Sequence, residues 1–191
     1  MFKKNKSVTV GIAVITIIVM LWLFGYAIVH VHMGRMECSY EGVSVYINYP
    51  ESNISKDKAI ALLMQERNLT ILAIYESGMA FKMTNTSLSN DTLARIECVL
   101  IFPDKFVGRN YSIYRNYSVY IEYHSQNASS RLVYSQQEKK EWIQHAEENY
   151  SKDKGILEPY IRSVAPLINK TIGVGYSEIK WAERPECKLC E

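Results

Sequence analysis

Hydrophobic and polar residues follow two patterns along this chain, and the change comes near residue 31. From Val8 to Val31 the sequence is apolar and contains no Asp, Glu, Lys or Arg. As a helix rising about 1.5 Å per residue, this segment exceeds the roughly 20 residues needed to cross the hydrocarbon core of a bilayer. Beyond it, apolar residues alternate or recur at helical spacing, which is typical of a folded domain. The pattern predicts a tail over 1–7, a transmembrane helix over 8–31 and one domain over 32–191.

Alternation of apolar and polar side chains predicts the strands of this domain. Glu76-Ser77-Gly78 would join two of them as a hairpin, and a strongly apolar strand that ends before Pro103 should be central. The expected strands are Cys38–Tyr49, Leu69–Tyr75, Met79–Thr84, Ala94–Phe102, Asn110–Tyr123, a short one near Arg131–Tyr134, and Val174–Ala182.

Helical spacing of apolar residues predicts three helices in the domain. Ser55 is a suitable N-cap for a helix that ends near Arg67, and two more are expected over 135–150 and 155–168. Pro166 should kink or end the last one, because proline lacks an N–H and clashes with the preceding turn. This order of elements predicts an α+β fold, with a mainly antiparallel sheet and helices on one face.

The basic residues are placed so as to orient the chain in a membrane. Lys3, Lys4 and Lys6 precede the apolar segment, which predicts a cytoplasmic N-terminus and an extracellular domain at the cell membrane. The net charge of +2 comes from this tail, because the remainder has 19 Lys and Arg against 20 Asp and Glu. The domain therefore has no charge pattern for nucleic-acid binding.

A cleaved secretory signal is the alternative interpretation of the apolar segment. Gly25 and Ala27 are small residues at positions that a signal peptidase would recognise. The apolar run before them is longer than the 7–15 residues usual in a signal peptide, which favours an uncleaved signal-anchor. Both interpretations place the domain outside the cell.

The asparagines give the strongest signal in the sequence. Ten of the eleven begin Asn-x-Ser/Thr with x other than Pro, and only Asn48 does not. Ser and Thr make up 24 of 191 residues, so chance would give about one or two such sequons. Asn5 lies in the tail. The predicted N-glycosylation sites are Asn53, Asn68, Asn85, Asn90, Asn110, Asn116, Asn127, Asn149 and Asn169.

Asn110 and Asn116 test this interpretation, because both lie in an expected strand. They are six residues apart, so both fall on the polar face, while Tyr117, Ile121 and their neighbours form the apolar face. Turn chemistry of Asn and Ser is the alternative explanation for sequons, but it does not account for a pair within a strand. A scarcity of unmodified Asn also suits a hot habitat, so an archaeal surface protein is the first expectation and a eukaryotic or viral glycoprotein the second.

The four cysteines all follow the apolar segment. Cys38, Cys98, Cys187 and Cys190 predict two disulfide bonds in an oxidising compartment, with the pairing left open. A bond from the tail to Cys38 or Cys98 would hold the C-terminus on the sheet. The alternative is a redox or metal site at Cys187-x-x-Cys190, although the adjacent acid Glu186 opposes thiol reactivity.

Other catalytic signatures are absent from the sequence, which contains no nucleophile elbow and no phosphate-binding loop. His30 and His32 stand at the outer membrane boundary, and His124 and His145 are isolated. We therefore predict a non-enzymatic glycoprotein without cofactor or bound metal, a structural or binding component of the cell envelope. Its expected partners are the lipid bilayer and proteins of the membrane or envelope, and the sequence leaves a small-molecule ligand open.

Overall fold

The computed structural model describes residues 15–25, 35–103, 116–182 and 184–189. Residues 15–25 are helical. The elements that follow are β1 (Met36–Asn48), α2 (Lys56–Leu63), β2 (Leu69–Ile74), β3 (Gly78–Met83), α3 (Asn90–Leu93), β4 (Ile96–Ile101), β5 (Ser118–Val133), α4 (Gln136–Ile172), β6 (Glu178–Trp181) and β7 (Glu186–Leu189). The predicted α+β class is confirmed.

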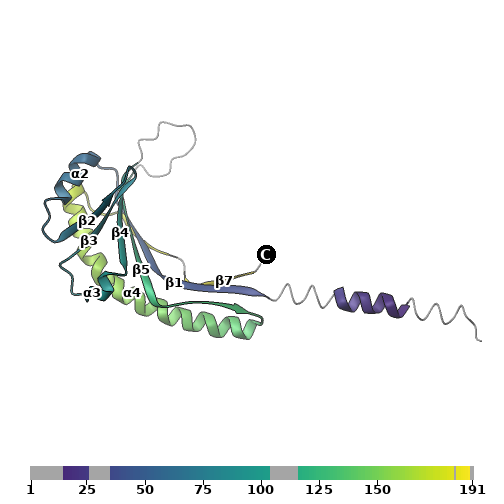
Figure 1. Ribbon diagram of the computed structural model, residues 1–191. Coiled ribbons are helices and arrows are strands. Elements are labelled where there is room, and N and C mark those ends of the chain that lie inside the picture. Colours follow the sequence, from purple (N-terminus) through teal and green to yellow (C-terminus); the bar gives the residue numbers. More distant parts are fainter. Residues whose placement is uncertain (1–14, 26–34, 104–115, 183, 190–191) are drawn as a thin grey trace, which may run out of the picture.

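The strands form one seven-stranded sheet in which every described pairing is antiparallel. The strand order is β2-β3-β4-β5-β1-β6, and β7 pairs with the other end of β1. The long helix α4 lies along one side of the sheet (Figure 1). α2 and α3 contribute Ala59, Leu63 and Leu93 to the same core, so all three helices cover the same face.

β1 and β5 belong to two regions of the molecule, because both strands bend midway (Figure 1). Their pairing shifts register there: Glu41 alone stands opposite 125–128. We call Met36–Tyr40, Ser129–Val133, β7 and the part of α4 that packs against them the arm. The remaining sheet, with the rest of the helices that cover it, is the main body. Each region has its own cluster of buried residues.

Gly42 allows the bend. Its φ is +152°, which L side chains rarely adopt, and a Cβ there would collide with the carbonyl oxygen of Tyr123. Glycine is therefore required where β1 passes from the arm into the main body.

α4 holds the two regions together along its length. Leu157, Tyr160, Val164 and Ile168 are buried against the main sheet, while Trp142 and Ala146 are buried in the arm. The hydroxyl oxygen of Tyr160 also accepts the backbone N–H of Met83 at 3.0 Å. Each large apolar side chain buried here contributes about 1.5–3 kcal/mol, so most of the helix stability comes from packing.

The two helices expected over 135–168 are a single helix, and Pro166 does not end it. α4 continues through Pro159 and Pro166 to Ile172, where Gly173 caps it in the left-handed conformation. An interior proline costs about 3 kcal/mol, but Ile168 and Ile172 beyond Pro166 are both buried. Their burial offsets the lost backbone hydrogen bond.

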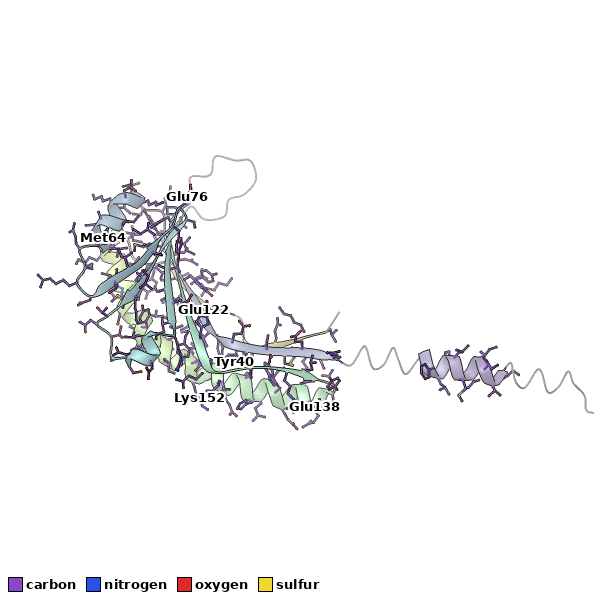
Figure 2. The ribbon with its side chains drawn as sticks, viewed as in Figure 1. Tyr40, Met64, Glu76, Glu122, Glu138 and Lys152 are labelled. Carbon is purple, nitrogen blue, oxygen red and sulfur yellow. A yellow bond between two sulfur atoms is a disulfide. The ribbon has the colours of Figure 1, made fainter. Side chains whose placement is uncertain are left out.

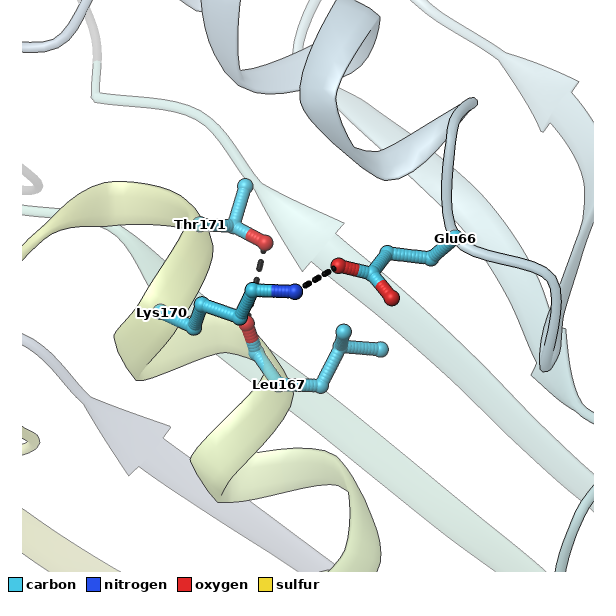
Figure 3. Close-up of polar contacts among 4 residues, drawn as sticks. All are labelled: Glu66, Leu167, Lys170 and Thr171. Carbon is cyan, nitrogen blue, oxygen red and sulfur yellow. Dashed lines mark hydrogen bonds and ion pairs between the residues drawn. The ribbon is translucent and has the colours of Figure 1, made fainter.

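The C-terminal end of α4 is also joined to the segment after α2. The Lys170 Nζ lies 2.6 Å from the Glu66 Oε1, and the Thr171 hydroxyl donates to the Leu167 carbonyl oxygen within the same turn (Figure 3). Since Lys170 is largely exposed, the ion pair contributes at most about 1 kcal/mol. It orients the end of the helix more than it stabilises the fold.

Three further elements differ from the sequence prediction. The short strand near Arg131–Tyr134 is the continuation of β5, while 110–115 of the expected double-sequon strand lie outside the described residues. The loop after β3 contains α3, which Ser89 caps by accepting the N–H of Thr92. The C-terminal tail forms β7, which has no apolar alternation to reveal it.

Candidate functional site

Six predicted glycan acceptors have exposed side chains, and they lie in loops, at element ends or at the bend. They are Asn53, Asn68, Asn85, Asn90, Asn116 and Asn127. Five belong to the main body, and Asn127 lies where β5 bends towards the arm. A glycan needs an asparagine side chain that points to solvent, and these six positions meet that requirement.

Two other sequons lie on α4 and are less accessible. Asn149 is 3% exposed, with its amide nitrogen 3.4 Å from the His145 Nε2, so this packing leaves no access for a glycan there. Asn169 is half-buried, and its side-chain oxygen has no hydrogen-bond partner. Both residues lie on α4, where helical spacing places them on a side of the helix that is partly or fully covered.

The described half of the double-sequon strand follows the predicted alternation. Tyr117, Val119, Ile121 and Tyr123 are all buried, as the alternation predicts. Asn116 is exposed just before β5 begins. Asn110 lies outside the described residues.

The cysteines agree with the prediction in part. Cys38 and Cys187 form a disulfide bond that pairs β7 with the arm end of β1. This bond holds the C-terminal segment on the sheet, as expected for a bridge from the tail to Cys38. Cys190 lies outside the described residues.

Cys98 corrects the prediction that all four cysteines form disulfides. It is a free thiol, 2% exposed, in the core of the main body, while Cys38 and Cys187 are bonded to each other. Burial raises the pKa of the Cys98 thiol well above its ordinary value. It therefore acts as a small apolar core residue rather than as a nucleophile.

A polar cavity of about 260 Å³ lies beside the disulfide. Its walls combine β1 residues Glu37 and Tyr40 with Tyr150 of α4 and Arg184 and Lys188 of the tail. Acidic and basic groups are mixed around it, so the cavity has no single charge preference. Nothing in this lining defines a ligand.

Tyr40 anchors the arm end of β1 to α4 beneath this cavity. Its hydroxyl donates to the Asp153 carboxylate at 2.6 Å, and both side chains are buried. Burial and the neighbouring carboxylate raise the pKa of Tyr40 above its ordinary value. A buried aspartate needs such a donor, because an unpaired charge in the interior is costly.

The sheet face that points away from α4 has an aromatic centre. Tyr120 pairs with Tyr46 across the β5–β1 ladder, and their ring centroids are 4.8 Å apart. Val99 and Lys180 extend this row onto β4 and β6. Tyr46 is 38% exposed, so the row is accessible to solvent.

Glu97, Glu122 and His124 lie on the same open face, on the main-body side of the bend. Glu97 on β4 stands directly opposite Glu122 on β5, and His124 follows two residues later on the same face. One ligand atom from each of the three side chains lies within 4.8 Å of the other two. Figure 2 labels Glu122 above the bend and Tyr40 on the arm side.

Sequence reasoning missed this group. It took His124 for an isolated residue, and Glu97 is more than twenty positions from the other two. Only the β4–β5 register brings them together, and no fixed spacing along the chain encodes it.

The helix over 15–25 belongs to the apolar segment predicted to cross a membrane. Its large apolar side chains are exposed, from Val19 at 48% to Phe24 at 71%. Within the ranges that the structure describes, none of the helices combines the length and the apolar character needed to span a bilayer. The other residues of the 8–31 segment fall outside those ranges.

Comparisons with models of protein families, with curated proteins and with solved structures found no match to this chain.

Proposed function

We propose that this chain is a membrane-anchored, N-glycosylated surface protein whose domain is a non-enzymatic structural or binding component of the cell envelope. The observation that carries the proposal is the exposure of six sequon asparagines, among them Asn53 and Asn116. Ten sequons among eleven asparagines are far above the chance expectation. Frequency and exposure are independent, and both favour glycosylation.

The disulfide and the apolar segment support the proposed location. A bond between Cys38 and Cys187 forms and persists in an oxidising compartment, which fits a domain outside the cytoplasm. The exposed apolar side chains over 15–25 need an apolar partner, and lipid would cover all of them. We propose that the whole 8–31 segment is the anchor and that 1–7 stays in the cytoplasm.

We further propose that envelope proteins contact the arm. The exposed sequons lie on the main body and at the bend, so glycans there would leave the outer part of the arm bare. Tyr134 and Leu189 at the arm are 63% and 67% exposed. Exposed aromatic and aliphatic side chains are typical of contact surfaces.

The experiment is fractionation of cells that produce the full chain, followed by protease treatment of intact cells. We expect the chain to stay in the membrane fraction through an alkaline wash and its domain to be cleaved from outside. Ile18→Lys together with Leu21→Lys should release it, since each central lysine costs about 2.5–3.5 kcal/mol of insertion free energy. Lys58→Arg, on exposed α2 surface, is the control. A wild-type chain in the soluble fraction, or a domain protected in intact cells, would contradict the proposal.

A redox role for the C-terminal cysteine motif is the alternative, and counting free thiols distinguishes the two. The Cys38–Cys187 bond leaves no free thiol at Cys187. Two alkylatable tail cysteines in the native protein would favour the redox role, and none would favour the envelope component.

A further inference from the structure

Three side chains on the open face of the sheet supply a mixed set of metal ligands. Glu97 belongs to β4, and Glu122 and His124 belong to β5. Their ligand atoms lie within 4.8 Å of one another, and the His124 Nε2 is 3.7 Å from the Glu97 Oε1. Rotation about side-chain bonds can shorten these distances to the roughly 3 Å that separates ligand atoms around one ion with bonds near 2 Å.

The backbone beneath the three side chains is fixed. Glu97 and Glu122 are direct partners in the β4–β5 ladder, and the His124 N–H donates to the Arg95 carbonyl oxygen at 3.1 Å. The ladder therefore extends across all three ligand positions. Ligands on paired strands are held more firmly than ligands on loops.

The charges around the group favour a cation. Two carboxylates that face each other across paired strands repel. The Glu97 carboxylate lies near the His124 imidazole, whereas among the described residues no Lys or Arg forms an ion pair with Glu122. Arg95 is nearby, but its guanidinium contacts the side-chain oxygen of Gln126. A divalent ion between the two glutamates would neutralise both.

The ligand types indicate which ion fits. Imidazole with two carboxylates suits Zn²⁺ and its first-row neighbours, whereas Ca²⁺ and Mg²⁺ prefer oxygen ligands alone. Three protein ligands leave at least one position for water. His124 and Glu97 are half or more exposed, so an ion here would sit at the protein surface within reach of an external ligand.

We propose that Glu97, Glu122 and His124 form a surface site for a divalent transition metal of the Zn²⁺ type. The site is independent of the proposed envelope function, since neither glycan nor anchor contributes to it. It differs from a metal site at the C-terminal cysteines, because no sulfur takes part.

The experiment is a titration of the full chain in detergent, first with Co²⁺ and then with Zn²⁺. The visible absorption of bound Co²⁺ is the signal recorded throughout. The protein carries no polyhistidine tag, and its background is His30→Ala with His32→Ala, which removes the other imidazole pair. We expect one Co²⁺ per chain, displaced by Zn²⁺ but not by excess Ca²⁺. His124→Ala and Glu122→Gln should each weaken binding at least about tenfold.

Two control variants separate this site from general surface binding. His145→Ala removes the other described histidine, and Glu178→Gln removes a carboxylate from β6 on the same open face. Both should bind Co²⁺ like the background. Unchanged affinity in His124→Ala, equal losses in the controls, or no Co²⁺ binding in the background would each overturn the proposal.

Discussion

The main body and the arm share β1, β5 and α4, but they reach stability by different means. The main body buries a large cluster that includes Phe81, Leu100 and Leu157. The arm buries six residues, among them Met36, Val133 and Trp142, and adds the Cys38–Cys187 disulfide and the Tyr40–Asp153 hydrogen bond. A small core seldom stabilises a structure alone, so covalent and polar links supplement it.

The proposed sugar distribution follows the same division. The exposed sequons lie on the main body or at the bend, and the one sequon on α4 beneath the arm, Asn149, is buried. The main body can carry glycans on its loops, because its stability comes from its large core rather than from those loops. We propose that the region with the small core stays free of glycans and that partners bind there.

The largest expected effect is Phe81→Ala in the main body. Phe81 is fully buried between the sheet and α4, so its truncation should lower the free energy of unfolding by about 3–5 kcal/mol. Denaturant unfolding measures this. Leu72→Ala, at an exposed position of edge strand β2, should stay within about 0.5 kcal/mol. Equal effects of the two changes would mean that the main body lacks the described core.

Removal of the disulfide should affect mainly the arm. Cys38→Ala with Cys187→Ala opens a link between residues 149 positions apart, and loss of such a bond costs about 2–5 kcal/mol. We expect amide hydrogens of β7 to exchange much faster while those of β4 keep their protection. Cys98→Ala should leave β7 protected. Unchanged exchange in β7 would show that the arm does not depend on the bond.

Gly42 tests the bend between the two regions. Gly42→Ala places a Cβ against the Tyr123 carbonyl at a positive φ, so it should destabilise the protein by about 1–3 kcal/mol. Gly155→Ala is the matched control in the interior of α4, where a Cβ meets nothing within 4 Å. It should stabilise by about 0.5–1 kcal/mol. Thermal unfolding of both variants gives the sign of each effect.

The smallest expected effect is the pH dependence due to Cys98. Burial raises the pKa of its thiol in the folded chain, whereas an unfolded thiol ionises near about pH 8.5. Above that pH the unfolded chain binds fewer protons, so stability falls as pH rises, by about 1.4 kcal/mol per pH unit. Unfolding midpoints from pH 7.5 to 9.5 should fall less in Cys98→Ala. Equal slopes would show that the thiol is not buried.

The sequence predicted the main body better than the arm, for a physical reason. Main-sheet strands bury one face against helices, so Val43, Val45 and Ile47 alternate visibly with polar residues. The arm part of β5 and all of β7 are mostly exposed, and they are held by pairing with β1 rather than by apolar alternation.

Long-range relations were likewise beyond the sequence pattern. The disulfide was expected, but the choice of Cys38 as the partner of Cys187 depends on how β7 folds back. The Glu97–Glu122 pair depends on strand register. The single helix that continues past Pro166 was not predicted, because local propensity does not include the packing of Ile168 and Ile172.

Site-resolved mass spectrometry of glycopeptides from the native protein tests the account most directly. We expect glycans at the exposed asparagines Asn53, Asn68, Asn85, Asn90, Asn116 and Asn127, and an unmodified Asn149. Bare side chains at all six exposed positions, or a glycan on Asn149 in the folded protein, would contradict it.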